Sequence, residues 1–168
     1  LIGALTGISS EKLAISEIGV SYPDPAYFKG SRVGIPFIFL LRDVLQYDHT
    51  VDDSISRMAN AHRTGMFILG VGDGKADYVR GFAYSHEELH VYGANDLLPE
   101  NSTWHPKIPD VVYNGMDYIC PTFCTVLATQ LQKYHGRLTP EIAMRDVTSV
   151  LMSGDNHLAW YDLTNQIM

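Results

Sequence analysis

Residues 66–73 read MFILGVGD, residues 77–85 read DYVRGFAYS and residues 88–93 read ELHVYG, and these three stretches decide the fold class. Their apolar residues alternate with polar ones or run on without interruption, which is typical of half-buried and fully buried strands. The glycines around Asp73 divide the first stretch from the second, and polar residues around His86 divide the second from the third. The pattern predicts three successive strands joined by short turns.

The segment before these strands predicts one strand and two helices. Residues 12–22 alternate in polarity and end at two prolines, as a strand and its stop do. Apolar residues then recur at helical spacing from Phe37, directly after Pro36, which a first helical turn tolerates. Thr50, with Asp53 three residues later, predicts the capped start of a second helix.

The segment after them predicts a strand at 110–113, helices at 121–136 and 139–151, and a closing strand at 157–163. Strands and helix pairs follow one another in groups, so the fold class is α+β rather than a regular βαβ alternation. We expect a sheet between helices, not a parallel sheet with alternating crossovers. The core is expected to contain Leu5, Leu13, Ile15, Leu41, Leu45, Ile68, Leu127, Leu151 and Leu158.

The composition predicts one globular domain covering residues 1–168. The formal net charge is -7, and the acidic residues are scattered, so no nucleic-acid footprint is visible. No apolar stretch reaches the roughly 20 residues that a membrane-spanning helix needs. The first residues are apolar and lack both an initiator Met and the pattern of a signal peptide. We therefore expect further protein on both sides of this sequence.

The stretch from His86 to His90 matches the H-E-x-x-H pattern of zinc peptidases, with Glu87 as the residue that would activate water. Zinc binding by this pattern requires a helix, and strand-like residues on both sides leave room for barely one turn. We therefore favour solvated turn residues and expect neither a metal nor a cofactor, while a zinc peptidase stays an alternative. Residues 70–75 (GVGDGK) lack the Ser or Thr and the helix of a phosphate loop, and predict a turn.

The two cysteines and one sequon bear on the cellular compartment. Cys120 and Cys124 are separated by three residues, not the two of a redox pair, which favours a local disulfide or two buried thiols. Asn101 begins the glycosylation triplet NST in a polar loop. A glycosylated Asn101 suits a lysosomal or secreted protein.

Four segments, taken in order, resemble one family. They are LTGISSEKLAISEIGV (5–20), GIPFIFLLRDVLQYDHTVDDSI (34–55), FILGVGDGKADYVRGFAYS (67–85) and SGDNHLAWYDLTNQIM (153–168). Together they resemble the acid-ceramidase-like and penicillin-acyltransferase-like branch of the N-terminal nucleophile hydrolases. The resemblance implies a four-layer αββα sandwich and a self-cleavage that exposes a Cys. The thiol of that Cys attacks an amide or ester, and its own α-amino group acts as the base.

The resemblance also assigns roles to residues of this chain. Neither cysteine lies where the family nucleophile is found, so the nucleophile is expected upstream of Leu1, and this chain would be the large downstream part of the enzyme. Glu17, on the strand after LTG, is the nearest match to an acidic or amide site residue. Asn114 is the candidate for the amide that stabilises the oxyanion. Arg32 and Asp117 are weaker candidates.

The expected function is a cysteine-dependent amidohydrolase or acyltransferase acting on an amide bond of an N-acylated small molecule or lipid. Its expected partners are the upstream segment of the same precursor and that acylated substrate, with no nucleic acid and no transmembrane segment. The sequence leaves other functions open: a family member without catalysis that serves as a binding or structural protein, or an unrelated α+β binding domain.

Overall fold

A computed structural model describes residues 2–20, 22, 31–114, 122–151 and 158–168. Its centre is an antiparallel sheet in which the strands lie side by side in chain order. The strands are β1 (Gly7–Ile8), β2 (Leu13–Gly19), β3 (Phe67–Asp73), β4 (Tyr78–Tyr84) and β5 (Leu89–Tyr92). The three successive strands predicted from residues 66–93 are confirmed, and the chain is α+β.

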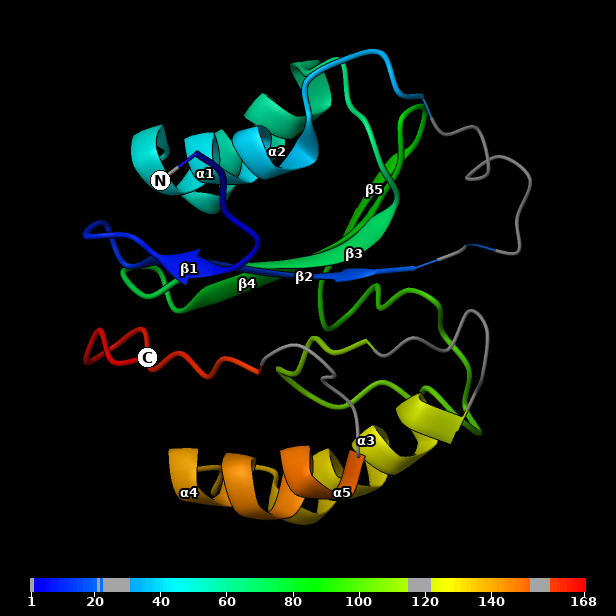
Figure 1. Cartoon of the computed structure of the whole chain (residues 1–168). Helices are drawn as coiled ribbons and strands as arrows, with labels where there is room; N and C mark the ends of the chain where they lie inside the picture. The colour runs from blue at the N-terminus through cyan, green and yellow to red at the C-terminus, as the bar shows by residue number, and fades with distance from the viewer. Residues whose placement is uncertain (1, 21, 23–30, 115–121, 152–157) are drawn as a thin grey trace.

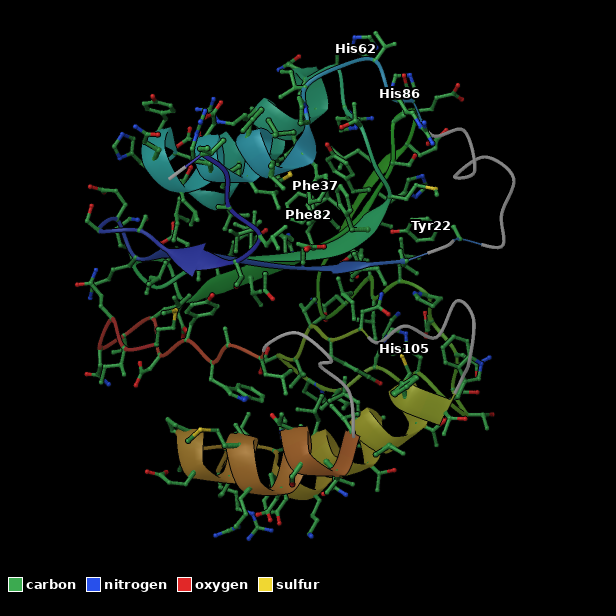
Figure 2. The ribbon with its side chains drawn as sticks, viewed as in Figure 1. Tyr22, Phe37, His62, Phe82, His86 and His105 are labelled. Carbon is green, nitrogen blue, oxygen red and sulfur yellow. The ribbon has the colours of Figure 1, made fainter. Side chains whose placement is uncertain are left out.

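Two helices cover one face of the sheet (Figure 1): α1 (Phe37–Tyr47) and α2 (Val51–Asn60). The predicted start of α2 is confirmed, because the Thr50 hydroxyl accepts from the Asp53 amide and the Asp53 carboxylate accepts from the Thr50 amide. Figure 2 shows Phe37 and Phe82 between this helix pair and the sheet. The core of this layer includes Leu13, Ile15, Leu41, Val44, Met58, Leu69, Val71, Phe82 and Tyr84.

The opposite face of the sheet is covered first by coil and then by helices. Figure 1 shows residues 95–114 and the C-terminal residues 158–168 between the sheet and a second helical layer. That layer contains α3 (Thr122–Tyr134), followed by α4 (Pro140–Ile142), the π-helical η1 (Ala143–Thr148) and α5 (Ser149–Leu151). The core on this face includes Val20, Tyr22, Ile68, Ala83, Tyr92, Leu97, Ile108, Tyr113 and Ala128.

Two predicted strands are wrong. Residues 110–113 form no strand, because the segment folds back on itself through a single bridge between Ile108 and Val111. Residues 158–163 are coil with one bridge from Asp162 to Ile167, and His157 lies outside the described residues. Both segments contain strand-forming residues. In the structure each of them forms only an isolated bridge.

The predicted core is confirmed at Leu13, Ile15, Leu41 and Ile68, which are at most 5% exposed. Leu45 and Leu127 are half-buried and pack against the core, and Leu151 is also half-buried. Leu5 and Leu158 are exposed, so their prediction is wrong. Leu5 lies before the short strand β1, and Leu158 lies in the coil that replaces the expected last strand.

Candidate functional site

The Asn114 side chain links the sheet to the layers beneath it. Its amide nitrogen donates to the Tyr92 hydroxyl at 3.0 Å and to the Leu98 carbonyl at 2.9 Å. Its amide oxygen lies 3.9 Å from Sγ of Cys124, a buried residue of α3. Since an amide NH₂ has two hydrogens, these two contacts use both donors. Asn114 is therefore held rigidly, with its donors directed at protein atoms.

A buried histidine holds the backbone next to Asn114. His105 is fully buried, and its Nε2 lies 3.0 Å from the Tyr113 carbonyl oxygen, while its Nδ1 contacts the Pro99 carbonyl oxygen. Because a carbonyl only accepts and a neutral imidazole carries one N–H, the ring donates to one of these two carbonyls at a time. The Trp104 ring stacks on the imidazole at 5.7 Å between centroids, and Figure 2 places His105 below the sheet. His105 thus joins three points of the coil beneath the sheet.

Tyr113 is locked in the same way. Its hydroxyl donates to the Pro106 carbonyl at 2.6 Å, and its ring meets His105 edge-on at 4.4 Å. Burial raises the pKa of the Tyr113 phenol well above its usual value, and the nearby Cys124 raises that pKa further. The phenol is therefore neutral at physiological pH and acts as a hydrogen-bond donor.

Glu17 lies on the other side of the sheet from Asn114. It pairs in register with Leu69, which pairs with Phe82, so these side chains project from the same face. Leu69 and Phe82 belong to the core beneath α1 and α2, whereas Asn114 contacts Tyr92 in the core of the opposite face. Glu17 is half-buried. The structure therefore does not bring the two candidate residues together.

The H-E-x-x-H residues form no helix, because His86 to Glu88 lie in the turn between β4 and β5 and His90 lies in strand β5. His86 donates through Nδ1 to the Arg63 carbonyl at 2.6 Å, and Nε2 of His90 lies 3.3 Å from the Glu88 carboxylate. Figure 2 shows His86 beside His62, whose ring centroid is 5.1 Å away. The i, i+4 geometry that zinc binding requires is absent from this turn.

Arg63 explains why this turn is held so closely. The side chain is buried and donates to the carbonyls of Met58 and Ala59 in the last turn of α2. It also donates to the carbonyls of Ser85 and Glu87. A cation at the C-terminal end of a helix meets free carbonyls and the negative end of the helix dipole. The H-E-x-x-H turn is thus fastened to α2 by a structural arginine.

Of the residues 70–75 predicted as a turn, 70–73 belong to strand β3, and the turn to β4 begins at Gly74. The Lys75 ammonium donates to the His49 carbonyl at 2.7 Å and to the Glu11 carbonyl, and it lies 3.3 Å from the Asp73 carboxylate. Lys75 therefore joins three separate turns of the chain.

The remaining predicted residues are less informative. The Asn101 side-chain oxygen accepts from the amides of Thr103 at 2.9 Å and Trp104 at 3.2 Å, which forms a compact Asx turn at the sequon. Arg32 is exposed before α1. Cys120 and Asp117 lie outside the described residues, as does any pairing that involves them. Within the described part of the chain, no group of three or more His, Cys, Asp or Glu residues is placed to hold a metal ion.

Sequence reasoning missed the residues that organise this region, chiefly Tyr92, His105 and Arg63. Each is a single polar residue without a motif, and its importance comes from partners distant in the sequence. One signal was present for His105, which lies between Trp104 and Pro106 in the proline-rich loop. None of the helices in the described ranges is long and apolar enough to cross a membrane.

Comparison with known proteins gives two relatives from Dictyostelium discoideum. Protein dcd1A is 32% identical over 170 residues, which cover 96% of this chain and 36% of dcd1A. Protein dcd1B is 29% identical over 174 residues, which cover 99% of this chain and 33% of dcd1B. No family model matches the chain. The chain is thus similar to dcd1A and dcd1B along nearly its whole length, and it spans about a third of the length of each.

Proposed function

We propose that this chain is the downstream part of an N-terminal nucleophile hydrolase or acyltransferase of the acid-ceramidase-like and penicillin-acyltransferase-like branch. Its substrate is an N-acylated small molecule or lipid, and the bond it cleaves is the amide. The nucleophile is a Cys outside residues 1–168 that self-cleavage places at a new N-terminus. There its α-amino group, with a pKa near ~8, accepts the thiol proton.

The observation that carries the proposal is the arrangement of the layers. An antiparallel sheet lies between two helical layers, with α1 and α2 inserted between β2 and β3. The four-layer αββα sandwich of the family has this first helix pair and sheet. In the described residues, coil occupies the place where the sandwich has a second sheet. The proposal therefore assigns the second sheet of the sandwich to segments of the full-length protein outside residues 1–168.

Asn114 is the residue on which the proposal can be tested. It is the candidate oxyanion donor, a role in which its amide would stabilise the charge that develops on the substrate oxygen. Its amide hydrogens bond Tyr92 and Leu98, so one of these bonds must give way to the substrate oxygen. Glu17 projects from the face covered by α1 and α2, so the proposal does not place it beside the same substrate.

The test uses the full-length, self-cleaved protein and a fluorogenic fatty-acyl amide of aminomethylcoumarin. We expect Asn114→Ala to lower turnover by about 10²-fold or more, because one oxyanion donor is lost. Replacing the upstream Cys with Ala should abolish both self-cleavage and hydrolysis. Asn60→Ala is the matched control, since Asn60 lies on the exposed end of α2 and bonds only the Ser56 carbonyl.

Two results would contradict the proposal. Unchanged turnover in a stably folded Asn114→Ala protein removes Asn114 from the site. Hydrolysis that survives thiol alkylation removes the cysteine mechanism. A fully cleaved protein that binds acyl amides without hydrolysing them would support a family member that has lost catalysis.

The proposed location is a lysosome or the extracellular space, with an acidic optimum in the lysosomal case. The exposed residues beside Asn101 suit a glycosylated loop. Loss of a glycan-sized mass in Asn101→Gln protein from a secreting cell would support this location, and an unchanged mass would oppose it.

A further inference from the structure

His105 is a fully buried titratable side chain whose two ring nitrogens both face carbonyl oxygens. Its Nε2 lies 3.0 Å from the Tyr113 carbonyl oxygen, and its Nδ1 contacts the Pro99 carbonyl oxygen. Because both partners can only accept, the lone pair of a neutral imidazole points at one of the two oxygens. A ring that carries two N–H groups turns both contacts into hydrogen bonds. The arrangement is therefore complementary to the doubly protonated ring.

The surroundings of His105 replace part of the hydration that a charged imidazole loses on burial. Burial by itself disfavours the charged form of a histidine. Against this, the two carbonyl oxygens accept from the ring, and a hydrogen bond from a charged donor is stronger than one from a neutral donor. The Trp104 ring also stacks on the imidazole, with 5.7 Å between the centroids and 11° between the planes. Since an aromatic face attracts a cation, this contact favours the same form.

The titratable side chains packed around this ring are phenols and a thiol. Tyr113 meets the ring edge-on at 4.4 Å. Burial raises the pKa of its phenol well above the usual value, and the nearby Cys124 of α3 raises that pKa further. From β5, the Tyr92 hydroxyl reaches the same loop through Asn114. Phenols and thiols are uncharged at acidic pH, so these groups do not compete for an added proton.

The charged groups of the same loop that the structure describes lie toward its surface. Glu100 and Lys107 form an ion pair at 2.9 Å, so their charges largely cancel, and Asp110 is exposed. His135, directly after α3, is also exposed, and its Nε2 lies 2.7 Å from a carbonyl oxygen of the loop. A proton on His105 is thus a change of charge in the buried part of the loop.

We propose that His105 is a pH-dependent latch. At acidic pH the ring takes a second proton from solvent and bonds the Pro99 and Tyr113 carbonyls at once, whereas at higher pH it releases one of them. Because Tyr113 directly precedes Asn114, the latch controls how firmly Asn114 is held. Its consequence for amide hydrolysis rests on the proposed function, but the latch itself does not.

The stabilisation of the loop by the second proton is present at acidic pH and lost at higher pH. An imidazole in an unfolded chain titrates near pH ~6.5. A loop that binds the second proton more tightly than the unfolded chain is stabilised fully below that pH, and the stabilisation disappears as the pH rises above it. Each tenfold difference in proton affinity changes the equilibrium between the closed and open loop by up to about tenfold.

Hydrogen exchange of the full-length protein, read by mass spectrometry of peptic peptides, measures the latch locally. The informative peptides cover residues 99–113, where Asn101 and His105 exchange two backbone hydrogen bonds and the Val111 amide donates to the Ile108 carbonyl. After correction for the pH dependence of chemical exchange, we expect about tenfold more protection of these amides at pH 5 than at pH 8. Peptides from β3 and β4 should change less and serve as the internal reference.

Two variants assign the effect to one histidine. His105→Gln keeps an amide that donates to a carbonyl but does not titrate, so protection of its loop should not depend on pH. If His105→Gln does not fold, His105→Asn takes its place. His135→Gln is the matched control, because His135 is exposed and contacts a carbonyl of the same loop. It should keep the pH dependence.

Equal protection of the loop at pH 5 and pH 8 in the unaltered protein overturns the proposal. A pH dependence that persists without His105, or that is lost in His135→Gln, also overturns it, because another group is then responsible. None of these measurements needs a substrate, so the latch and the proposed hydrolysis can fail separately.

Discussion

At the scale of single residues, His105 holds the loop that leads to Asn114 in place. It is fully buried and presents both ring nitrogens to carbonyl oxygens of the loop that leads to Asn114. A side chain of similar shape without a donor would lose the hydrogen bond that the ring makes to these carbonyls. The geometry of Asn114 therefore depends on a residue that lies outside the proposed chemistry.

We expect His105→Phe to lower the free energy of unfolding by about 1–3 kcal/mol, because a buried carbonyl loses its hydrogen bond. Urea unfolding of the full-length protein measures this. His135→Phe is the control, because His135 is exposed and its change should stay within about 0.5 kcal/mol. Equal stability of the two variants would show that the His105 contacts contribute little.

Sequence patterns could predict the hydrogen-bond partner of a single residue only where that partner lies close to it in the sequence. The pair Thr50 and Asp53 was predicted correctly because its two members lie three residues apart. The role of Asn114 came from a resemblance, whereas its contact with Tyr92 crosses the space between the sheet and the coil. No periodicity in the sequence encodes a contact of that kind.

At the scale of elements, one set of paired residues across β3, β4 and β5 explains how the sheet contacts the coil beneath it. Gly70 of β3 and Gly81 of β4 are register partners, and Gly81 pairs with Tyr92 of β5. A Cβ on Gly81 would lie 2.3 Å from the Tyr92 ring, whereas a Cβ on Gly70 would meet nothing within 4 Å. The Tyr92 ring thus lies flat across Gly81, which places its hydroxyl beside Asn114.

Gly81→Ala should therefore destabilise the protein by about 1–3 kcal/mol, because the Tyr92 ring must move in a packed core. Gly70→Ala should be neutral or stabilising by up to about 1 kcal/mol, because the unfolded chain loses freedom and no atom is displaced. Thermal unfolding of the two variants compares them directly. Similar losses in both would mean that strand flexibility, not the Tyr92 contact, requires these glycines.

Most elements followed from the sequence, and the errors have a common cause. The strands β2 to β5 and the helices α1 and α2 have strong patterns that match their burial. The last helical segment was predicted as one α-helix, but it contains the π-helical η1, which has more residues per turn than an α-helix. In this segment Ala143 and Val147 are buried, while Val150 is exposed. Residues 110–113 and 158–163 have strand-like composition but form only isolated bridges in the structure. A local pattern does not contain the partner strand that a ladder needs.

At the scale of the whole molecule, the sheet lies between the two helical layers (Figure 1). The α+β class was predictable because groups of strands and helix pairs are visible in the chain order. The relative placement of Glu17 and Asn114 was not, because it depends on which face each strand presents to the coil. A one-residue difference in register would exchange the two faces.

The insertion of α1 and α2 between β2 and β3 also dictates an order of assembly. The strands β3, β4 and β5 are joined by short turns, so their pairing closes small loops and can form early. Strand β2 can pair with β3 only after the chain that contains α1 and α2 has brought the two strands together, because that helix pair separates them in the sequence. In pulse-labelling hydrogen exchange during refolding, the amides of Phe82, which faces β3, and Ala83, which faces β5, should gain protection before that of Ser16, which faces β3 from β2. Simultaneous protection would mean that the helix pair and the whole sheet assemble in one cooperative step.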